Sequence, residues 1–261
     1  MDKLYVIKIG GQVIDDEEKL SLFLKDFAQL PHKKILVHGG GKLATRLAEQ
    51  LHLPQQMVEG RRITDAETLK VVTMVYAGWI NKNIVAQLQG NGCDAIGMSG
   101  ADGNAIKAKK REAAGIDYGF AGDINAVDAN KLQGLLNDAD ALVISPITHN
   151  GQGQLLNTNA DTIAQEVAKA LSAYFAVELI YSFEKPGVLL DANDERTVIA
   201  KINAAYYAEL KSKSLVFAGM IPKLDNAFQA LQAGVRRVAI GDAGRIQQLP
   251  EGNSGTSIIA S

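Results

Sequence analysis

The fold is decided by residues 4–11, which read LYVIKIGG, and residues 34–41, which read KILVHGGG. Each stretch is a short apolar run that ends in glycines, as expected for a buried strand and the loop that follows it. Each is followed by a segment with helical periodicity, at 17–30 and 42–51. A repeated order of strand, glycine loop and helix indicates parallel strands joined by right-handed crossovers.

The remainder of the chain continues this alternation and predicts an α/β sandwich with two functional lobes that meet near 171–175. The expected helices lie at 65–89, 128–137, 158–171, 203–211 and 220–233, the expected strands at 94–98, 141–144, 175–181, 237–240 and 257–259, and hairpins within 104–123 and around Asn150-Gly151.

Composition and charge exclude several classes of protein. The 261 residues include 27 Lys and Arg against 29 Asp and Glu, a net charge of −2 that favours neither nucleic acid nor an anionic membrane as partner. The sequence holds no apolar run long enough to span a bilayer. The single cysteine, Cys93, cannot form an internal disulfide, which is typical of a reducing compartment. We therefore expect a cytoplasmic protein.

Two lysines stand where structure alone does not favour them. Lys8 ends an apolar strand, where a charge is costly unless it is used, although its ammonium could also reach solvent from the strand end. Lys223 stands at the start of a helix, where its charge opposes the helix dipole. An external anion such as a phosphate would account for both positions, and Gly10 and Gly11 would let the backbone approach it.

A second glycine cluster, Gly39-Gly40-Gly41, ends the second strand and opens a helix. Its backbone N–H groups would lie at the positive end of the helix dipole, which suits an anion. The run GGGKLA at 39–44 imitates a dinucleotide fingerprint, but it follows the second strand and no acidic residue ends a strand at the required distance. It also imitates a P-loop, but Leu43 stands where Ser or Thr must bind magnesium. The histidines lack metal-ligand spacing, so no protein-held metal is expected.

The stretch from Asn157 to Asp161 reads NTNAD and precedes an expected helix. One of Asn157, Thr158 and Asn159 is expected to cap that helix, and Asp161 in its first turn suits the dipole. A cap requires only one residue. Two asparagines and an aspartate together therefore indicate a site.

These motifs together resemble those of the amino acid kinase family, and within it the kinases that act on an N-acylated glutamate. The motifs are KxGG at 8–11, VHGGG at 37–41, GxRITD at 60–65, NxNAD at 157–161 and GMIPK at 219–223. In this order they cover nearly the whole chain. The resemblance implies one domain over 1–261 with an open, mainly parallel eight-stranded sheet between two helix layers. An N-terminal lobe, 1–172, would bind the acyl-glutamate and a C-terminal lobe, 173–261, would bind ATP.

The resemblance also implies residue roles and an assembly. Lys8 and Lys223 would stabilise the transferring phosphoryl group, and Asp161 would orient both lysines. A homodimer would form through the helix at 65–89. The acyl-glutamate would be held by Gly40, Gly41, Arg62 and Asn157. The nucleotide, which would carry Mg²⁺ with it, would contact Gly10, Gly11, Phe183, Glu184, Gly187, Val188, Leu189, Phe217, Gly219 and Met220.

Two alternatives remain open from the sequence. The resemblance implies N-acetyl-L-glutamate, but Arg61 stands where the family has an apolar residue, and its charge would suit a larger acidic acyl group such as succinyl. Strand alternation argues against this, because it predicts that Arg61 points away if Arg62 faces the substrate. The other alternative is a catalytically silent amino-acid-binding regulator, although the presence of both lysines and Asp161 favours an enzyme.

Overall fold

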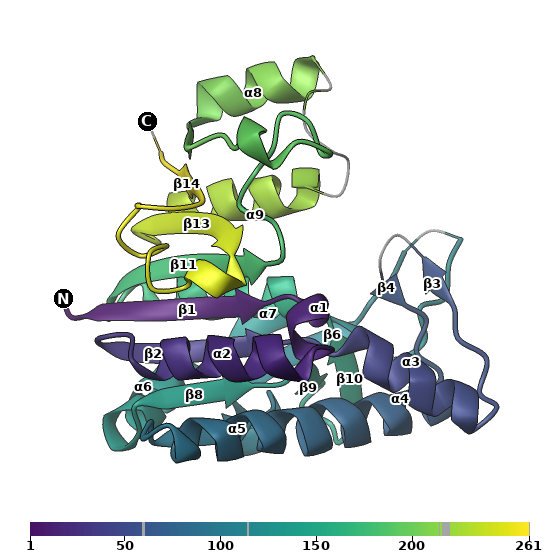
Figure 1. The fold of residues 1–261 in the computed structure, drawn as a ribbon. Helices are drawn as coiled ribbons and strands as arrows, with labels where there is room; N and C mark the ends of the chain where they lie inside the picture. Colours follow the sequence, from purple (N-terminus) through teal and green to yellow (C-terminus); the bar gives the residue numbers. More distant parts are fainter. Residues whose placement is uncertain (59–60, 114, 214, 216–219, 261) are drawn as a thin grey trace.

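The structure is a computed structural model that describes residues 1–58, 61–113, 115–213, 215 and 220–260 (Figure 1). Its helices and strands are, in order, β1 (Lys3–Ile9), α1 (Gly11–Ile14), α2 (Glu17–Ala28), β2 (Lys33–His38), α3 (Gly41–Gln50), β3 (Met57–Val58), β4 (Arg61–Arg62), α4 (Ala66–Val72), η1 (Thr73–Ile80), α5 (Asn81–Gly90), β5 (Ala95–Met98), η2 (Asp102–Asn104), β6 (Ile106–Lys110), β7 (Ala121–Val127), α6 (Ala129–Asp138), β8 (Ala141–Ile144), β9 (Ile147–His149), β10 (Leu155–Thr158), α7 (Ala160–Leu171), β11 (Ala176–Phe183), η3 (Glu195–Thr197), β12 (Lys201–Ile202), α8 (Ala204–Ser212), α9 (Ile221–Gln232), β13 (Arg237–Asp242), η5 (Ala243–Arg245) and β14 (Thr256–Ile258).

Eight of the described strands form one open sheet in the order β12-β14-β13-β11-β1-β2-β8-β5. Neighbouring strands are parallel except for β13 and β14, so the expected mainly parallel α/β sandwich is confirmed. β1 lies near the centre, where Lys8 is level with Tyr181 of β11 and Val37 of β2. The loops that follow β1, β2 and β11 therefore leave the sheet at the same edge.

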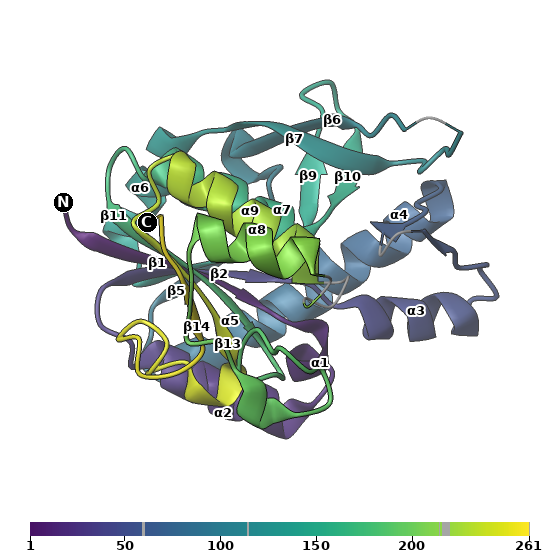
Figure 2. The same ribbon diagram turned by 90° about the horizontal axis from the view of Figure 1, so that it is seen from above.

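Helices cover both faces of the sheet (Figure 2). Leu4 and Val6 of β1 pack in a core with residues of α6, α7, α8 and α9, whereas Tyr5 and Ile7 pack in a second core with α2, η1 and α5. Side chains alternate between the two faces of a strand, so Lys8 lies on the face of Leu4 and Val6. This alternation directs its ammonium toward α7.

Local sequence explains why these layers form, and α2 is an example. The Asp16 side chain accepts the backbone N–H of Lys19 at 3.1 Å and so caps the helix. The apolar residues that recur at helical spacing after the cap are all buried against the sheet: Leu20, Phe23, Leu24 and Phe27.

A small barrel lies beside the main sheet (Figure 2). The hairpins expected within 104–123 and around Asn150-Gly151 form, because β6 pairs with β7 and β9 pairs with β10 in antiparallel fashion. In addition, β10 pairs with β7 and β6 pairs with β9 in parallel fashion, which closes the four strands. This closure joins strands from separate hairpins, so no local sequence pattern predicts it.

The helix expected at 158–171 begins later than predicted. Residues 155–158 form β10, and α7 begins at Ala160. The cap is Asn159, one of the three candidates, and its side chain accepts the N–H of Thr162 at 3.1 Å. The helix starts later than predicted because the strand continues through Thr158. Asn157 and Thr158 thus belong to a strand that borders the site.

The long helix expected at 65–89 runs from Ala66 to Gly90, but its middle third is the π-helical segment η1. Val75 is buried in the core, whereas Met74 and Trp79 are 56% and 68% exposed. Apolar residues of this helix therefore lie on two faces, one packed against the sheet and one exposed to solvent. No helix in the described part of the chain has the length and apolar character that a bilayer crossing requires.

Candidate active site

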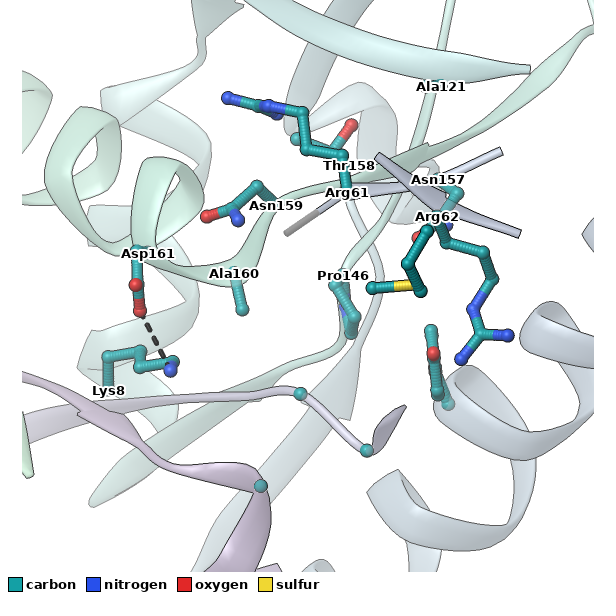
Figure 3. A pocket seen from close by; sticks show the side chains of 15 residues that line it. Lys8, Arg61, Arg62, Ala121, Pro146, Asn157, Thr158, Asn159, Ala160 and Asp161 are labelled. Atoms are coloured by element: carbon teal, nitrogen blue, oxygen red, sulfur yellow. Dashed lines mark ion pairs between the residues drawn. The ribbon is translucent and has the colours of Figure 1, made fainter. Parts of the chain in front are cut away.

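Asp161 forms ion pairs with both lysines that the sequence singles out. Its Oδ1 lies 2.8 Å from Nζ of Lys8, and its Oδ2 accepts a hydrogen bond from Nζ of Lys223 at 2.7 Å (the Lys8 pair is drawn in Figure 3). Lys8 comes from β1, Asp161 from the first turn of α7 and Lys223 from the first turn of α9. We call these three residues the charged trio. Their side chains are only 16–25% exposed.

The ionisation state of Asp161 follows from its contacts with the two lysines. Burial alone would raise the pKa of the Asp161 carboxyl, but the ammonium groups of Lys8 and Lys223 outweigh it and hold that pKa well below its usual range. Asp161 is therefore ionised near neutral pH, and the trio carries one net positive charge. Two ammonium groups held in place beside a partly buried site form a preorganised site for an anion.

A cavity of about 230 Å³ opens beside Lys8 and Asp161 (Figure 3). The predicted site residues that line it are Lys8, Gly11, Gly40, Arg62, Asn157 and Asp161. They come from β1, α1, β4, β10, α7 and the loop after β2, so the fold gathers Gly40, Arg62 and Asn157 of the residues that the sequence predicted for the acyl-glutamate.

Gly40 is required by the shape of this cavity. Its φ of 155° is a conformation that residues with a side chain rarely adopt, and a Cβ there would overlap Cδ1 of Ile80 and lie 3.2 Å from the ring of Tyr76. The loop is therefore pressed against η1. Gly41, the next predicted residue, begins α3, where the first N–H groups of the helix have no partner within the helix. Such N–H groups bind anions.

Arg62 and Asn157 are positioned by neighbouring polar side chains. Arg62 is buried, and its guanidinium donates hydrogen bonds to Gln55 Oε1 and, at 2.8 Å, to Thr45 Oγ1. The Asn157 amide donates to Thr64 Oγ1 at 3.1 Å, and that hydroxyl donates to the Arg62 carbonyl at 3.0 Å. A guanidinium held in this way can grip a carboxylate through two parallel hydrogen bonds.

Figure 3 shows the side chains of Arg61 and Arg62 extending in opposite directions from β4, as strand alternation predicts. Both residues nevertheless line the cavity. β4 consists of these two residues and, within the described part of the chain, pairs with Met57 and Val58. Alternation across so short a strand does not decide which side chain reaches a neighbouring cavity.

Tyr76 is a wall residue that sequence reasoning missed. It lies in η1, is 5% exposed and lines the same cavity as Gly40. Burial raises the pKa of its phenol, and this rise is opposed by the Arg62 guanidinium with which the hydroxyl interacts. In the sequence Tyr76 is one of several apolar residues at helical spacing, and nothing there separates a wall residue from a core residue.

A second cavity, of about 390 Å³, lies beside Lys223 and has mainly apolar walls. It is lined by predicted nucleotide residues, namely Phe183, Glu184, Gly187, Val188, Leu189 and Met220. The two other residues predicted for this region, Phe217 and Gly219, lie outside the described residues. Gly10 directly follows β1, and its N–H donates a hydrogen bond to the Ser182 carbonyl of β11 at 2.8 Å.

The charged trio joins the two cavities. Lys8 and Asp161 line the first and Lys223 lines the second, so the ion pair between Asp161 and Lys223 spans the boundary between them. A group transferred from one cavity to the other would pass the two ammonium groups. No cluster of three or more His, Cys, Asp or Glu that could hold a metal is present among the described residues.

Comparison with known proteins agrees with this geometry. Residues 3–242 match the model of the amino acid kinase family. A protein of Cytophaga hutchinsonii named acetylglutamate kinase is 54% identical, over 100% of both chains. Among solved structures, a Streptococcus mutans protein, smu.665, shares 26% identity at a TM-score of 0.78, covering 100% of this chain and 99% of its own. A Giardia carbamate kinase shares the fold at a TM-score of 0.73 and 11% identity, over 100% of this chain and 99% of its own. The chain belongs to the amino acid kinase family.

Proposed function

We infer that the protein is an ATP-dependent kinase that phosphorylates the γ-carboxylate of N-acetyl-L-glutamate, giving ADP and the acyl phosphate, in arginine biosynthesis. The observation that carries this inference is the charged trio at the boundary of two cavities, in a chain that is 54% identical to an acetylglutamate kinase along its whole length. A silent amino-acid-binding regulator would not need two lysines held on one carboxylate between two cavities.

The first cavity is proposed to hold the acyl-glutamate. Arg62 would grip a carboxylate of the substrate, Asn157 would bind its polar groups, and the N–H groups at Gly40 and Gly41 would receive a carboxylate oxygen. The described residues that line this cavity lie between 8 and 161, which supports an N-terminal lobe, 1–172, as the acyl-glutamate lobe.

The second cavity is proposed to hold ATP, with Mg²⁺ brought in as part of the nucleotide substrate. Phe183, Val188, Leu189 and Met220 offer apolar walls to the base. Gly10 and Gly11 lie near the trio and would approach the phosphates through their backbone. The lining lies between 183 and 223, which supports a C-terminal lobe, 173–261, as the nucleotide lobe.

The chemistry then needs charge stabilisation and no base. A free γ-carboxyl titrates near about 4.3, so the nucleophile is already ionised near neutral pH. A carboxylate oxygen attacks the γ-phosphorus, and the bond to the bridging oxygen breaks to release ADP. At about 5 Å and an effective dielectric constant of about 20, each pair of unit negative charges repels by about 3 kcal/mol. Lys8 and Lys223 offset this repulsion by contacting the phosphoryl oxygens.

N-succinyl-L-glutamate is a second candidate substrate, because Arg61 lines the first cavity. Its guanidinium would form a charge-assisted hydrogen bond with the additional carboxylate of a succinyl group, which an acetyl group lacks. The chemistry of phosphoryl transfer would be the same.

We also propose that the protein is a cytoplasmic homodimer. The single buried Cys93 suits a reducing compartment. Met74 and Trp79, exposed together on the long helix, offer an apolar face to a second copy. Light scattering that gives the mass of one chain would exclude the dimer.

The test of the function is ADP release with each of a panel of acylated glutamates, with hydroxylamine present to trap the acyl phosphate. We expect ADP and trapped hydroxamate in equal amounts, and only with an N-acyl-glutamate present. ADP release that does not depend on the acyl-glutamate, or no release with any member of the panel, would contradict the proposal.

A further inference from the structure

The histidine that precedes the glycine loop is fully buried, and the mechanism above does not use it. His38 ends β2; its Nδ1 lies 2.8 Å from the Gly39 carbonyl oxygen, and its Nε2 lies 3.2 Å from Nδ2 of Asn81. A carbonyl oxygen only accepts hydrogen bonds, so Nδ1 carries the proton. Nε2 then accepts a hydrogen bond from the Asn81 amide.

The orientation of the Asn81 amide is fixed by its other partners. Its Nδ2 also donates to the Val143 carbonyl at 2.9 Å, and its Oδ1 accepts from Lys82 Nζ at 3.1 Å. Turning the amide over would set its oxygen against the Val143 carbonyl and its NH₂ group against the Lys82 ammonium. Lys82 is held in turn by the Gly97 carbonyl at 2.9 Å. The network therefore admits only the imidazole tautomer with the proton on Nδ1.

The loop needs such a restraint at Gly39. A Cβ at Gly39 would meet no atom within 4 Å, so packing leaves this residue room to move, whereas the next residue, Gly40, is pressed against Ile80 and Tyr76. Glycine also has the greatest backbone freedom of any residue. Gly39 and Gly40 both line the first cavity, so a rotation of the Gly39 peptide would move the wall of that cavity.

We propose that His38 is a positioning residue, which through Nδ1–H fixes the Gly39 carbonyl and with it the loop that receives the acyl-glutamate. This inference rests on the proposed role of Gly40 and Gly41 in binding that substrate. Burial lowers the pKa of the His38 imidazole to about 4, with a smaller contribution from Lys82, so the ring stays neutral over the working range of pH.

Two variants distinguish the contact made by Nδ1 of His38 from the contact made by its Nε2. In His38→Asn the side-chain amide reaches the place of Nδ1 and can still donate to the Gly39 carbonyl. In His38→Gln it reaches the place of Nε2 and keeps only the contact with Asn81. We expect His38→Gln to raise KM for N-acetyl-L-glutamate about tenfold, with KM for ATP unchanged, and His38→Asn to stay within about twofold of the wild type. His52→Asn, at an exposed histidine in the loop that follows α3, is the matched control.

Equal effects of the two variants, or a rise in KM for ATP as large as that for the acyl-glutamate, would overturn the proposal. A second measurement needs no variant. Nitrogen-15 NMR of the histidine-labelled wild type should show one ring as the Nδ1–H tautomer that does not titrate through neutral pH and that shifts when N-acetyl-L-glutamate is added. An Nε2–H tautomer or an imidazolium would refute the role of His38 itself. The expected tautomer with no shift on adding substrate would refute the coupling to the acyl-glutamate, and in that case ADP release tests the proposed function separately.

Discussion

Asp161→Asn tests whether the two lysines act through their charge alone or through their positions. The substitution keeps the size of the side chain but removes the charge that holds Lys8 at 2.8 Å and Lys223 at 2.7 Å. The net charge of the trio rises by one, so a site that worked by charge alone would attract the phosphates more strongly. However, two ammonium groups about 5 Å apart then repel by about 3 kcal/mol at an effective dielectric constant of about 20.

That repulsion moves the ammonium groups away from the places where the phosphoryl oxygens develop charge. We therefore expect kcat to fall by about 10²-fold, which is the rate equivalent of about 3 kcal/mol. KM for N-acetyl-L-glutamate should change much less, because Arg62 and Asn157 are held by Gln55, Thr45 and Thr64. Steady-state ADP release measures both constants, and thermal unfolding checks the fold. Asp128→Asn, which alters the exposed cap of α6, is the matched control. A kcat equal to or above that of the wild type would refute the positioning argument.

Three further predictions concern the first cavity and its loop. Gly40→Ala should raise KM for N-acetyl-L-glutamate at least about tenfold, since its Cβ would overlap Ile80, while Gly134→Ala, in open space on α6, should leave KM unchanged. Burial lowers the pKa of His38 from 6.5 to about 4, so the unfolded chain binds the proton more readily than the folded chain. The free energy of unfolding should therefore fall by about 3 kcal/mol as the pH drops from 6.5 to about 4. Urea titrations at several pH values measure this fall, and an equal fall in His38→Asn would contradict it. Arg61→Leu should lower kcat/KM for N-succinyl- relative to N-acetyl-L-glutamate if Arg61 reads the acyl group; an unchanged ratio would exclude that role.

The charged trio could be predicted because its residues conflict with local structural preference. A lysine in an apolar strand and a lysine at a helix N-terminus both need an anion, and this need is visible in the sequence. The loops after β1, β2 and β11 could be predicted for a related reason. Parallel strands bring their carboxyl ends to one edge of the sheet. The glycine loops that follow these strands therefore lie close together, however the rest of the chain folds.

The positions of Arg61 and Tyr76 could not be predicted because they depend on packing between distant segments. Whether Arg61 lines the cavity depends on the placement of the two-residue strand β4 relative to residues of β10, which line the same cavity from nearly a hundred residues later in the chain. Tyr76 faces the loop because η1 is wound as a π-helix, and apolar periodicity does not reveal this winding. The start of α7 was placed too early because β10 continues to Thr158, and the partner strand that pairs with Thr158, β7, belongs to another hairpin.

The central claim is that phosphoryl transfer takes place between the two cavities, past the ammonium groups of the trio. Lys223→Ala tests it most directly, because Lys223 lines the cavity proposed for the nucleotide, whereas the described residues that line the cavity proposed for the acyl-glutamate do not include it. Isothermal titration of this variant with N-acetyl-L-glutamate, beside its rate of ADP release, separates binding from catalysis. We expect a Kd close to that of the wild type and a kcat lower by about 10²–10³-fold, or about 2.7–4 kcal/mol of lost transition-state stabilisation. A Lys223→Ala variant that turns over at nearly the wild-type rate would contradict it.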